Sequence, residues 1–174
     1  MRLARDREAG HCWPMTTAAT LKSANDLFAR GEIEKAHALA APLFEANPDD
    51  PGLASLMGRL ALAVLKPNIA APLLARAVTA DPRDGVVQLA LGRALRALDR
   101  PKEAKAPLEA AVALMPQDAD AQFQLAELLE GEGEMSRARD SYEAAGRLAP
   151  DLAAIPLALA RIEQNQGHPE AAEV

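Results

Sequence analysis

Four prolines recur at a fixed interval along the 174-residue sequence, and this interval limits the possible folds more than any other feature. Pro48, Pro82, Pro116 and Pro150 are evenly spaced, at a constant step of thirty-four positions. Two sets of small residues keep the same step: Ala36, Ala70, Ala104, Ala138 and Ala172, and Ala24, Gly58, Gly92, Ala126 and Ala160. A fixed period of about 20–50 residues indicates a stack of supersecondary units rather than one globule around a central core.

The residue types at these positions predict antiparallel helix pairs. Small residues let two helices approach closely, and larger apolar residues such as Leu91, Leu95, Leu125 and Leu129 fill the remaining space. Each proline ends a unit because it cannot continue a helix and restricts the residue before it. Aromatic residues make up only 3% of the chain, so an interior of helix-forming Ala and Leu is expected.

The period and its registers resemble the tetratricopeptide repeat. Gly31, Gly133 and Gly167 stand where that family often has a turn glycine, and Tyr142 is the single aromatic at its register. Glu163 replaces an apolar residue, which puts the packing of the last unit in question. The resemblance implies an all-α, right-handed α-solenoid of about 4.5 helix pairs, covering nearly the whole chain.

We expect repeats at residues 17–50, 51–84, 85–118 and 119–152, with a partial repeat at 153–174. Residues 1–16 lie outside the repeat phase and are expected to form a disordered or weakly structured tail. The predicted helices are 17–30, 33–46, 51–64, 67–80, 85–98, 101–114, 119–130, 135–148 and 153–166, with another starting at Pro169.

Aspartates and internal prolines should shape individual helices. Asp50, Asp84, Asp118 and Asp151 follow the closing prolines and are suited to cap or favour the next helix start. Pro42, Pro72 and Pro107 fall inside second helices, where a proline costs about 3 kcal/mol or kinks the helix. We predict bends rather than breaks at these three positions.

Composition argues against several functional classes. A net charge of −6 does not suit nucleic-acid binding, and no apolar run reaches the roughly 18 residues that a membrane span needs. Cys12 is the single cysteine, and the three histidines have no zinc-helix spacing, so we expect neither a cofactor nor a metal site. No catalytic set is found, and a cytoplasmic, non-enzymatic protein is predicted.

The resemblance implies a working surface on the concave side, built from the first helix of each repeat. Carried over to this sequence, the predicted groove residues are Asn25, Phe28, Arg59, Leu62, Leu89, Arg93, Arg96, Phe123, Glu127, Glu130 and Arg161. This groove would be apolar at its N-terminal end and charged further along. Its predicted partner is a protein or peptide whose carboxylates bind arginine forks and whose apolar side chains contact the two phenylalanines.

The charges leave two interpretations open. Arg93 could pair with Glu127, and Arg96 with Glu130, across neighbouring helices, in which case they would neutralise each other. Alternatively, the two signs of charge would orient an extended peptide. Arg59 is the stronger candidate, because its counterparts Asn25 and Arg93 cannot neutralise it.

Three functional hypotheses follow. The first is a non-catalytic scaffold that binds a peptide or protein in the groove. The second is the N-terminal repeat portion of a larger bacterial enzyme such as a transferase. The third is self-association, for example a homodimer, through the uncapped C-terminal end, since the sequence stops at Val174 one turn into a predicted helix.

Overall fold

The computed structural model describes residues 17–167, and this range contains nine α-helices and no strands. The helices are α1 (Thr17–Ala29), α2 (Ile33–Ala46), α3 (Pro51–Ala63), α4 (Pro67–Ala80), α5 (Gly85–Ala97), α6 (Pro101–Leu114), α7 (Ala119–Gly131), α8 (Met135–Leu148) and α9 (Ala154–Gly167). Each bound lies within one residue of its prediction. The all-α solenoid of helix pairs is therefore confirmed. The expected tail at 1–16 and the helix start at Pro169 lie outside the described residues.

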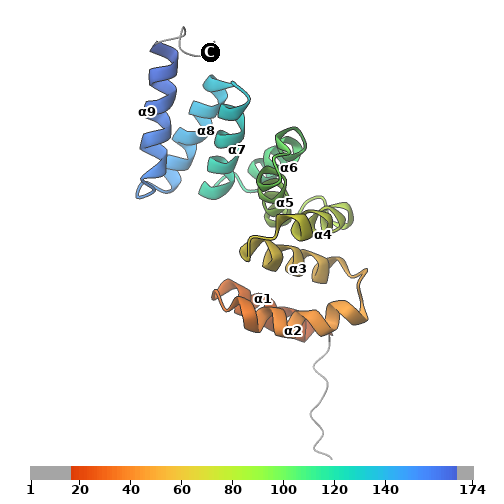
Figure 1. Ribbon diagram of the computed structural model, residues 1–174. Coiled ribbons are helices and arrows are strands. Elements are labelled where there is room, and N and C mark those ends of the chain that lie inside the picture. The colour runs from red at the N-terminus through yellow and green to blue at the C-terminus, as the bar shows by residue number, and fades with distance from the viewer. Residues whose placement is uncertain (1–16, 168–174) are drawn as a thin grey trace, which may run out of the picture.

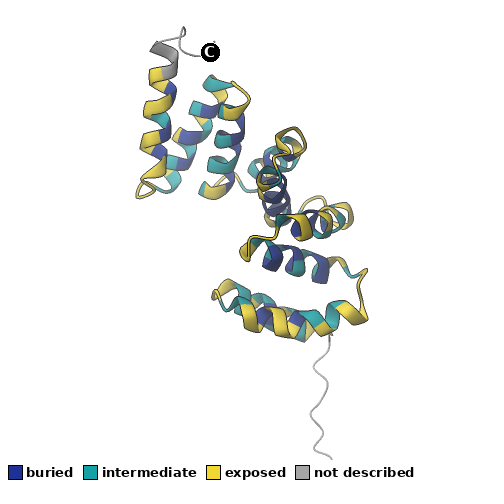
Figure 2. Ribbon diagram, viewed as in Figure 1, coloured by how far each residue is buried: buried dark blue, intermediate teal, exposed yellow. Residues whose placement is uncertain are grey.

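The helices stack in two layers along an arched array (Figure 1). The odd-numbered helices α1, α3, α5 and α7 contact one another in succession and form the inner layer. Each of the even-numbered helices α2, α4, α6 and α8 packs against the odd-numbered helix before it and the one after it. Buried residues lie along the facing sides of these helices (Figure 2). No single centre holds the chain together, since each pair is buried mainly by its neighbours.

The small residues of the period lie where paired helices touch. A methyl group added at Gly92 would lie 2.5 Å from both Cγ and Cδ2 of Leu108, and one added at Gly58 would lie 2.7 Å from Cγ of Leu74. The glycine and the leucine occupy the same two repeat positions in both pairs. These contacts explain why the register requires small residues: a larger one would push the two helices apart.

The turns within helix pairs share one backbone conformation. Gly31, Leu65, Asp99 and Gly133, which occupy the same position in successive repeats, have φ values of 76°, 57°, 56° and 79°. In each turn the next residue's N–H donates to a carbonyl oxygen five residues earlier, as Lys66 does to Ala61 at 2.9 Å. This left-handed ending closes the first helix of each pair. Glycine adopts it without strain, whereas leucine and aspartate adopt it at a cost.

Three of the four predicted aspartate caps are confirmed. Asp50 and Asp118 each accept a hydrogen bond at 2.8 Å from the backbone N–H three residues later. Asp84 accepts hydrogen bonds from Val86 and Val87 at 3.0 and 3.1 Å. Asp151 differs, because it stands one position earlier in its repeat than the other three, and Leu152 occupies their register. Since α9 begins only at Ala154, this carboxylate does not occupy the N-cap position.

The internal prolines do not break their helices. The second helices α2, α4 and α6 run through Pro42, Pro72 and Pro107 respectively. The prediction that these helices continue is confirmed, and the bend at each proline stays a prediction. Three other prolines stand at the first position of a helix, where a missing N–H costs nothing: Pro51, Pro67 and Pro101.

The last described helix packs through one side only. Ile155, Ala158 and Ile162 of α9 are buried, and α9 contacts α8. Glu163 and Ala160 are exposed, although the counterparts of Ala160 in the four preceding odd-numbered helices are buried. Glu163 therefore does not prevent the packing of α9, because its carboxylate points to solvent.

Candidate functional site

The inner layer carries a diagonal series of side-chain pairs, each joining residues 31 positions apart on neighbouring odd-numbered helices. Three pairs are in contact: Phe28 with Arg59, Arg96 with Glu127, and Glu130 with Arg161. Leu62 and Arg93 stand at the same step and line one hollow. We call this series the groove ladder. Its eight members were all among the predicted groove residues, and its composition changes along the array.

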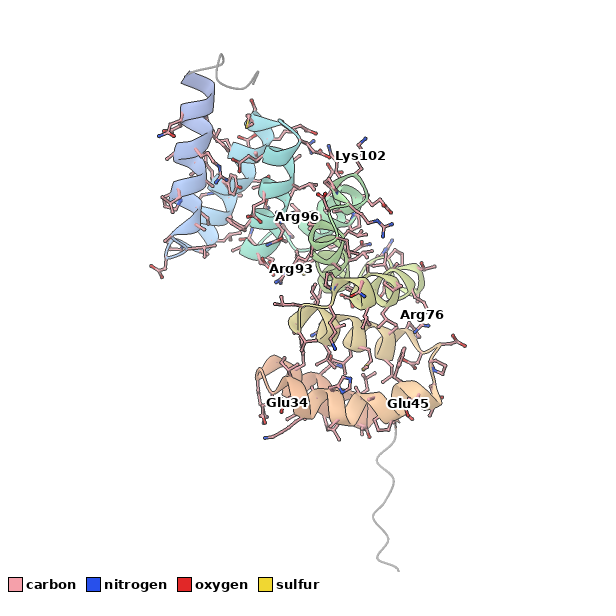
Figure 3. All side chains as sticks on the ribbon, in the orientation of Figure 1. Glu34, Glu45, Arg76, Arg93, Arg96 and Lys102 are labelled. Atoms are coloured by element: carbon pink, nitrogen blue, oxygen red, sulfur yellow. The ribbon has the colours of Figure 1, made fainter. Side chains whose placement is uncertain are left out.

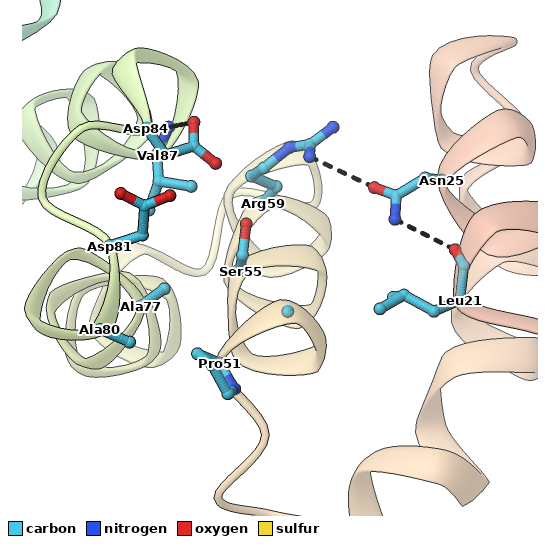
Figure 4. Close-up of a pocket in the computed structure, with 11 residues that line it drawn as sticks. Leu21, Asn25, Pro51, Ser55, Arg59, Ala77, Ala80, Asp81, Asp84 and Val87 are labelled. Carbon is cyan, nitrogen blue, oxygen red and sulfur yellow. Dashed lines mark hydrogen bonds between the residues drawn. The ribbon is translucent and has the colours of Figure 1, made fainter. Parts of the chain in front are cut away.

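Arg59 forms the first pair of the ladder with Phe28. Its guanidinium carbon lies 4.6 Å from the centre of the Phe28 ring, within range of a cation–π interaction. Nη1 of Arg59 also donates to Oδ1 of Asn25 at 3.3 Å, and Nδ2 of Asn25 donates to the carbonyl of Leu21 at 3.0 Å (Figure 4). Helix α1 therefore holds both the ring and the amide that position Arg59.

Arg59 is also the ladder cation that lacks a carboxylate. Among the described residues, no carboxylate oxygen lies within 4.0 Å of its nitrogens. Burial lowers the pKa of its guanidinium, and the charge of Asp84 opposes that change. The group is thus partly removed from water while keeping hydrogen-bond donors that Asn25 does not use. As expected, neither Asn25 nor Arg93 neutralises it.

Two hollows flank Arg59 on the groove side. One, of about 370 Å³, lies between α1, α3 and the ends of α4 and α5, and it is lined by Leu21, Asn25, Pro51, Gly52, Ser55, Arg59, Ala77, Ala80, Asp81, Asp84 and Val87 (Figure 4). The other, of about 240 Å³, is lined by Phe28, Arg59, Leu62, Ala63, Val86, Leu89, Ala90 and Arg93. Leu62 and Leu89 therefore line this hollow, although Leu89 is only 8% exposed.

Both arginines of α5 pair with carboxylates of α7, as one of the two interpretations held, but their partners differ from those it named. Arg93 pairs with Asp120 at 3.1 Å rather than with Glu127. Arg96 pairs with Glu127 at 2.8 Å, and with the Gln124 amide oxygen at 2.5 Å, rather than with Glu130. Figure 3 shows both arginines on α5. Both Arg96–Glu127 and Glu130–Arg161 join residues 31 positions apart, so neighbouring odd-numbered helices meet with an offset of about one turn and equivalent positions do not face each other.

Glu130 closes the C-terminal end of the ladder. Its two oxygens accept hydrogen bonds from Nε and Nη2 of Arg161 at 2.5 and 2.6 Å, a bidentate arrangement. The Tyr142 hydroxyl of α8 donates to the same carboxylate at 2.8 Å. Arg161 foremost, and Tyr142 as well, hold the pKa of Glu130 below its usual value. Burial and the bond to Glu130 raise the pKa of Tyr142.

Phe123 is half-buried and packs edge-on against Tyr142, with ring centres 5.6 Å apart and planes at 65°. It therefore supports the Glu130 end of the ladder, and its ring is partly occupied by this contact.

Sequence reasoning missed Asp120, Gln124 and Tyr142 as partners of groove residues. No single step in the sequence identifies them, since Asp120 lies 27 residues from Arg93, Gln124 lies 28 from Arg96, and Tyr142 lies 12 from Glu130.

Two further features are absent from the described residues: a cluster that could hold a metal ion and a helix that could span a membrane. Among residues 17–167, no group of three His, Cys, Asp or Glu side chains is placed to hold a metal ion. No helix in that range is long and apolar enough to cross a membrane. The Cys12 thiol lies outside the described residues.

These features define a class, the helical-repeat solenoids with a groove on the inner layer. A model of the tetratricopeptide repeat family matches residues 55–104 and 89–153, which together span residues 55–153 of the 174. The chain belongs to the tetratricopeptide repeat family. Proteins of this family generally serve as protein–protein interaction scaffolds.

Several solved structures have the same fold. The MamA protein is 22% identical with a TM-score of 0.74, over 90% of this chain and 86% of that one. YrrB, described as a TPR protein with an unusual peptide-binding site, is 23% identical with a TM-score of 0.74, over 91% of this chain and 82% of that one. TTC0263, a thermophilic TPR protein in Thermus thermophilus, is 24% identical with a TM-score of 0.66, over 87% of this chain and 84% of that one. No curated protein sequence matches the chain.

Proposed function

We propose that this chain is a non-catalytic scaffold that binds a peptide or protein partner at the N-terminal half of its groove ladder. The proposal rests on Arg59, whose guanidinium is partly removed from water, has no carboxylate partner among the described residues, and lies between two hollows. A carboxylate of the partner would take the free donors of Arg59. Apolar side chains of the partner would enter the hollow beside Phe28 and Leu62.

The energetics favour this end of the groove. A hydrogen bond to a charged group contributes about 1.5–3 kcal/mol, and the carboxylate would meet a guanidinium that is already oriented by Phe28 and Asn25. Arg96 and Arg161 offer less, because a partner's carboxylate would have to displace Glu127 or Glu130 from an existing pair. Charge alone therefore does not make an arginine available.

The fold neighbours support the proposal only in general terms. YrrB, which has the same fold, is described as having an unusual peptide-binding site. At 23% identity this likeness concerns the fold, so the residues of the present chain must carry the specificity.

Peptide display on the purified protein tests the proposal without requiring that the natural partner be identified. Selected peptides should contain an acidic residue or a free C-terminus beside apolar residues. Arg59→Gln should weaken their binding by about 10- to 100-fold, the ratio that 1.5–3 kcal/mol corresponds to. Arg100→Gln is the matched control, because Arg100, the N-cap residue of α6, pairs with Glu103 in the first turn of that helix, outside the groove.

Two results would count against this site. Peptides that bind wild type and Arg59→Gln equally would remove Arg59 from it. Peptides without any carboxylate near the apolar residues would refute the assigned chemistry while leaving the groove itself as a binding surface.

A further inference from the structure

The turn between α3 and α4 exposes a leucine in an unfavourable conformation. Leu65 has φ 57° and is 88% exposed, whereas the equivalent turns use glycine at Gly31 and Gly133 and a polar residue at Asp99 for the same backbone shape. A left-handed leucine is strained, and its exposed side chain contributes nothing to the fold of one chain. Neither local geometry nor packing within the chain accounts for this residue.

An apolar hollow lies directly beside Leu65. Its neighbours Val64 and Ile69 are 49% and 46% exposed. They border a hollow of about 370 Å³, which is lined by Ile33, Glu34, His37, Met57, Leu60, Ala61, Val64, Lys66 and Ile69. Met57, Leu60 and Ala61 lie on the face of α3 opposite Ser55, Arg59 and Leu62, so this hollow is separate from the groove.

The charges on the rim of the hollow are unpaired. Glu34, on α2 (Figure 3), and Lys66, at the start of α4, are both exposed. Within the described part of the chain, neither has an oppositely charged partner within 4.0 Å. The surface thus holds a protruding leucine, an apolar hollow, one free acid and one free base side by side.

We infer that a second copy of this chain occupies the hollow. A two-fold axis requires a surface that is complementary to itself, so that each feature meets its opposite on the partner copy. Here Leu65 of each copy would enter the hollow of the other. Glu34 of each copy would face Lys66 of the other. The resulting dimer leaves Arg59 and the groove ladder accessible, so it does not depend on the proposed function.

The first test measures molar mass by light scattering and sedimentation velocity over a range of concentrations. The surface is small, so we expect a reversible dimer with a dissociation constant between about 1 µM and 1 mM. Leu65→Gly should raise that constant at least about tenfold, because the protruding side chain is lost. The fold should be retained, since Gly31 and Gly133 already hold the equivalent turns. Circular dichroism verifies this.

Charge exchange provides the sharper test. Glu34→Lys alone and Lys66→Glu alone would each place like charges opposite each other, and both variants should be monomeric at concentrations where wild type dimerises. Mixing the two single variants should restore dimers, because every facing pair in the mixed dimer again has opposite signs. The doubly exchanged chain should dimerise as well.

Leu157→Ser is the matched control, because Leu157 is a 70% exposed leucine on α9, far along the chain. It should leave the dimer unchanged. A wild-type chain that remains monomeric up to about 1 mM would overturn the inference. So would a dimer that persists unchanged in Leu65→Gly, a mixture of charge variants that stays monomeric, or a dimer lost only in Leu157→Ser, which would place association at α9.

Discussion

The contact between Gly92 and Leu108 should make a single added methyl group destabilising. Alanine is normally the better helix former, by about 1 kcal/mol over glycine. At Gly92, however, the new methyl carbon would lie 2.5 Å from both Cγ and Cδ2 of Leu108, far inside the roughly 3.5–4.0 Å at which carbon atoms pack. Cγ is the branching carbon of a fully buried side chain, so it cannot swing away.

The expected size follows from these opposing effects. Overpacking a closed core costs about 1–3 kcal/mol, and the gain in helix propensity offsets roughly 1 kcal/mol of that. Because two carbon atoms of Leu108 would lie at 2.5 Å, we place the overpacking cost in the upper part of that range, about 2–3 kcal/mol. We therefore expect Gly92→Ala to lower the unfolding free energy by about 1–2 kcal/mol. For a chain of this length, that corresponds to a fall in Tm of roughly 2–8 °C.

Thermal and urea unfolding followed by circular dichroism provide the measurement, with Gly131→Ala as the matched control. Gly131 is also helical, but a methyl group there would meet nothing within 4 Å, so that substitution should be neutral or stabilising. In a double-mutant cycle, Gly92→Ala combined with Leu108→Ala should cost about 0.5–3 kcal/mol less than the sum of the two single changes. Stabilisation by Gly92→Ala of about 1 kcal/mol would refute the packing argument.

Three further predictions concern the remaining groove and helix ends. Tyr142 is the single tyrosine, and its pKa is raised in the folded protein. Its contribution to stability is therefore fully present below the ordinary pKa of 10.0 and is lost as the pH rises above that value. Absorbance titration should show no tyrosinate near pH 10 before unfolding. Arg161 lowers the pKa of Glu130, so the stability that this carboxylate contributes is present above the ordinary pKa of 4.5 and is lost as the pH falls below it. The midpoint of urea unfolding should therefore fall less between about pH 7 and 3 in Glu130→Gln than in wild type. Asp118→Ala should remove a helix cap and about 1 kcal/mol, measured as a lower Tm.

The sequence predicted the repeating framework because that framework depends on one constant repeat length. Prolines, small residues and capping aspartates each mark a helix end or a close contact, so the helix bounds were confirmed within one residue. The predicted cap at Asp151 is wrong, because Leu152 occupies the capping register of that repeat and α9 starts one residue later than its counterparts. Local chemistry thus determines where helices begin and end, but a register can still slip at one repeat.

The pairing across the groove was less predictable, because it depends on the tilt between neighbouring helices. Comparing equivalent positions suggested Arg93 with Glu127, yet the actual partner of Glu127 is Arg96. A ladder step of 31 residues combines the repeat length with an offset of about one helical turn. That offset is set by how neighbouring helices stack rather than by composition.

The ladder also explains how one groove can have two different ends. Where both members of a pair carry opposite charges, as in Arg96 with Glu127, the protein supplies its own counter-charge and an incoming carboxylate must compete with it. Where the pair joins a ring or an aliphatic side chain to a cation, as in Phe28 with Arg59, the ring orients the cation without neutralising it. A substitution on the ladder therefore acts through the residue 31 positions away. Phe28→Glu should close the N-terminal end by giving Arg59 the carboxylate it lacks, and this would abolish acidic-peptide binding without removing the arginine.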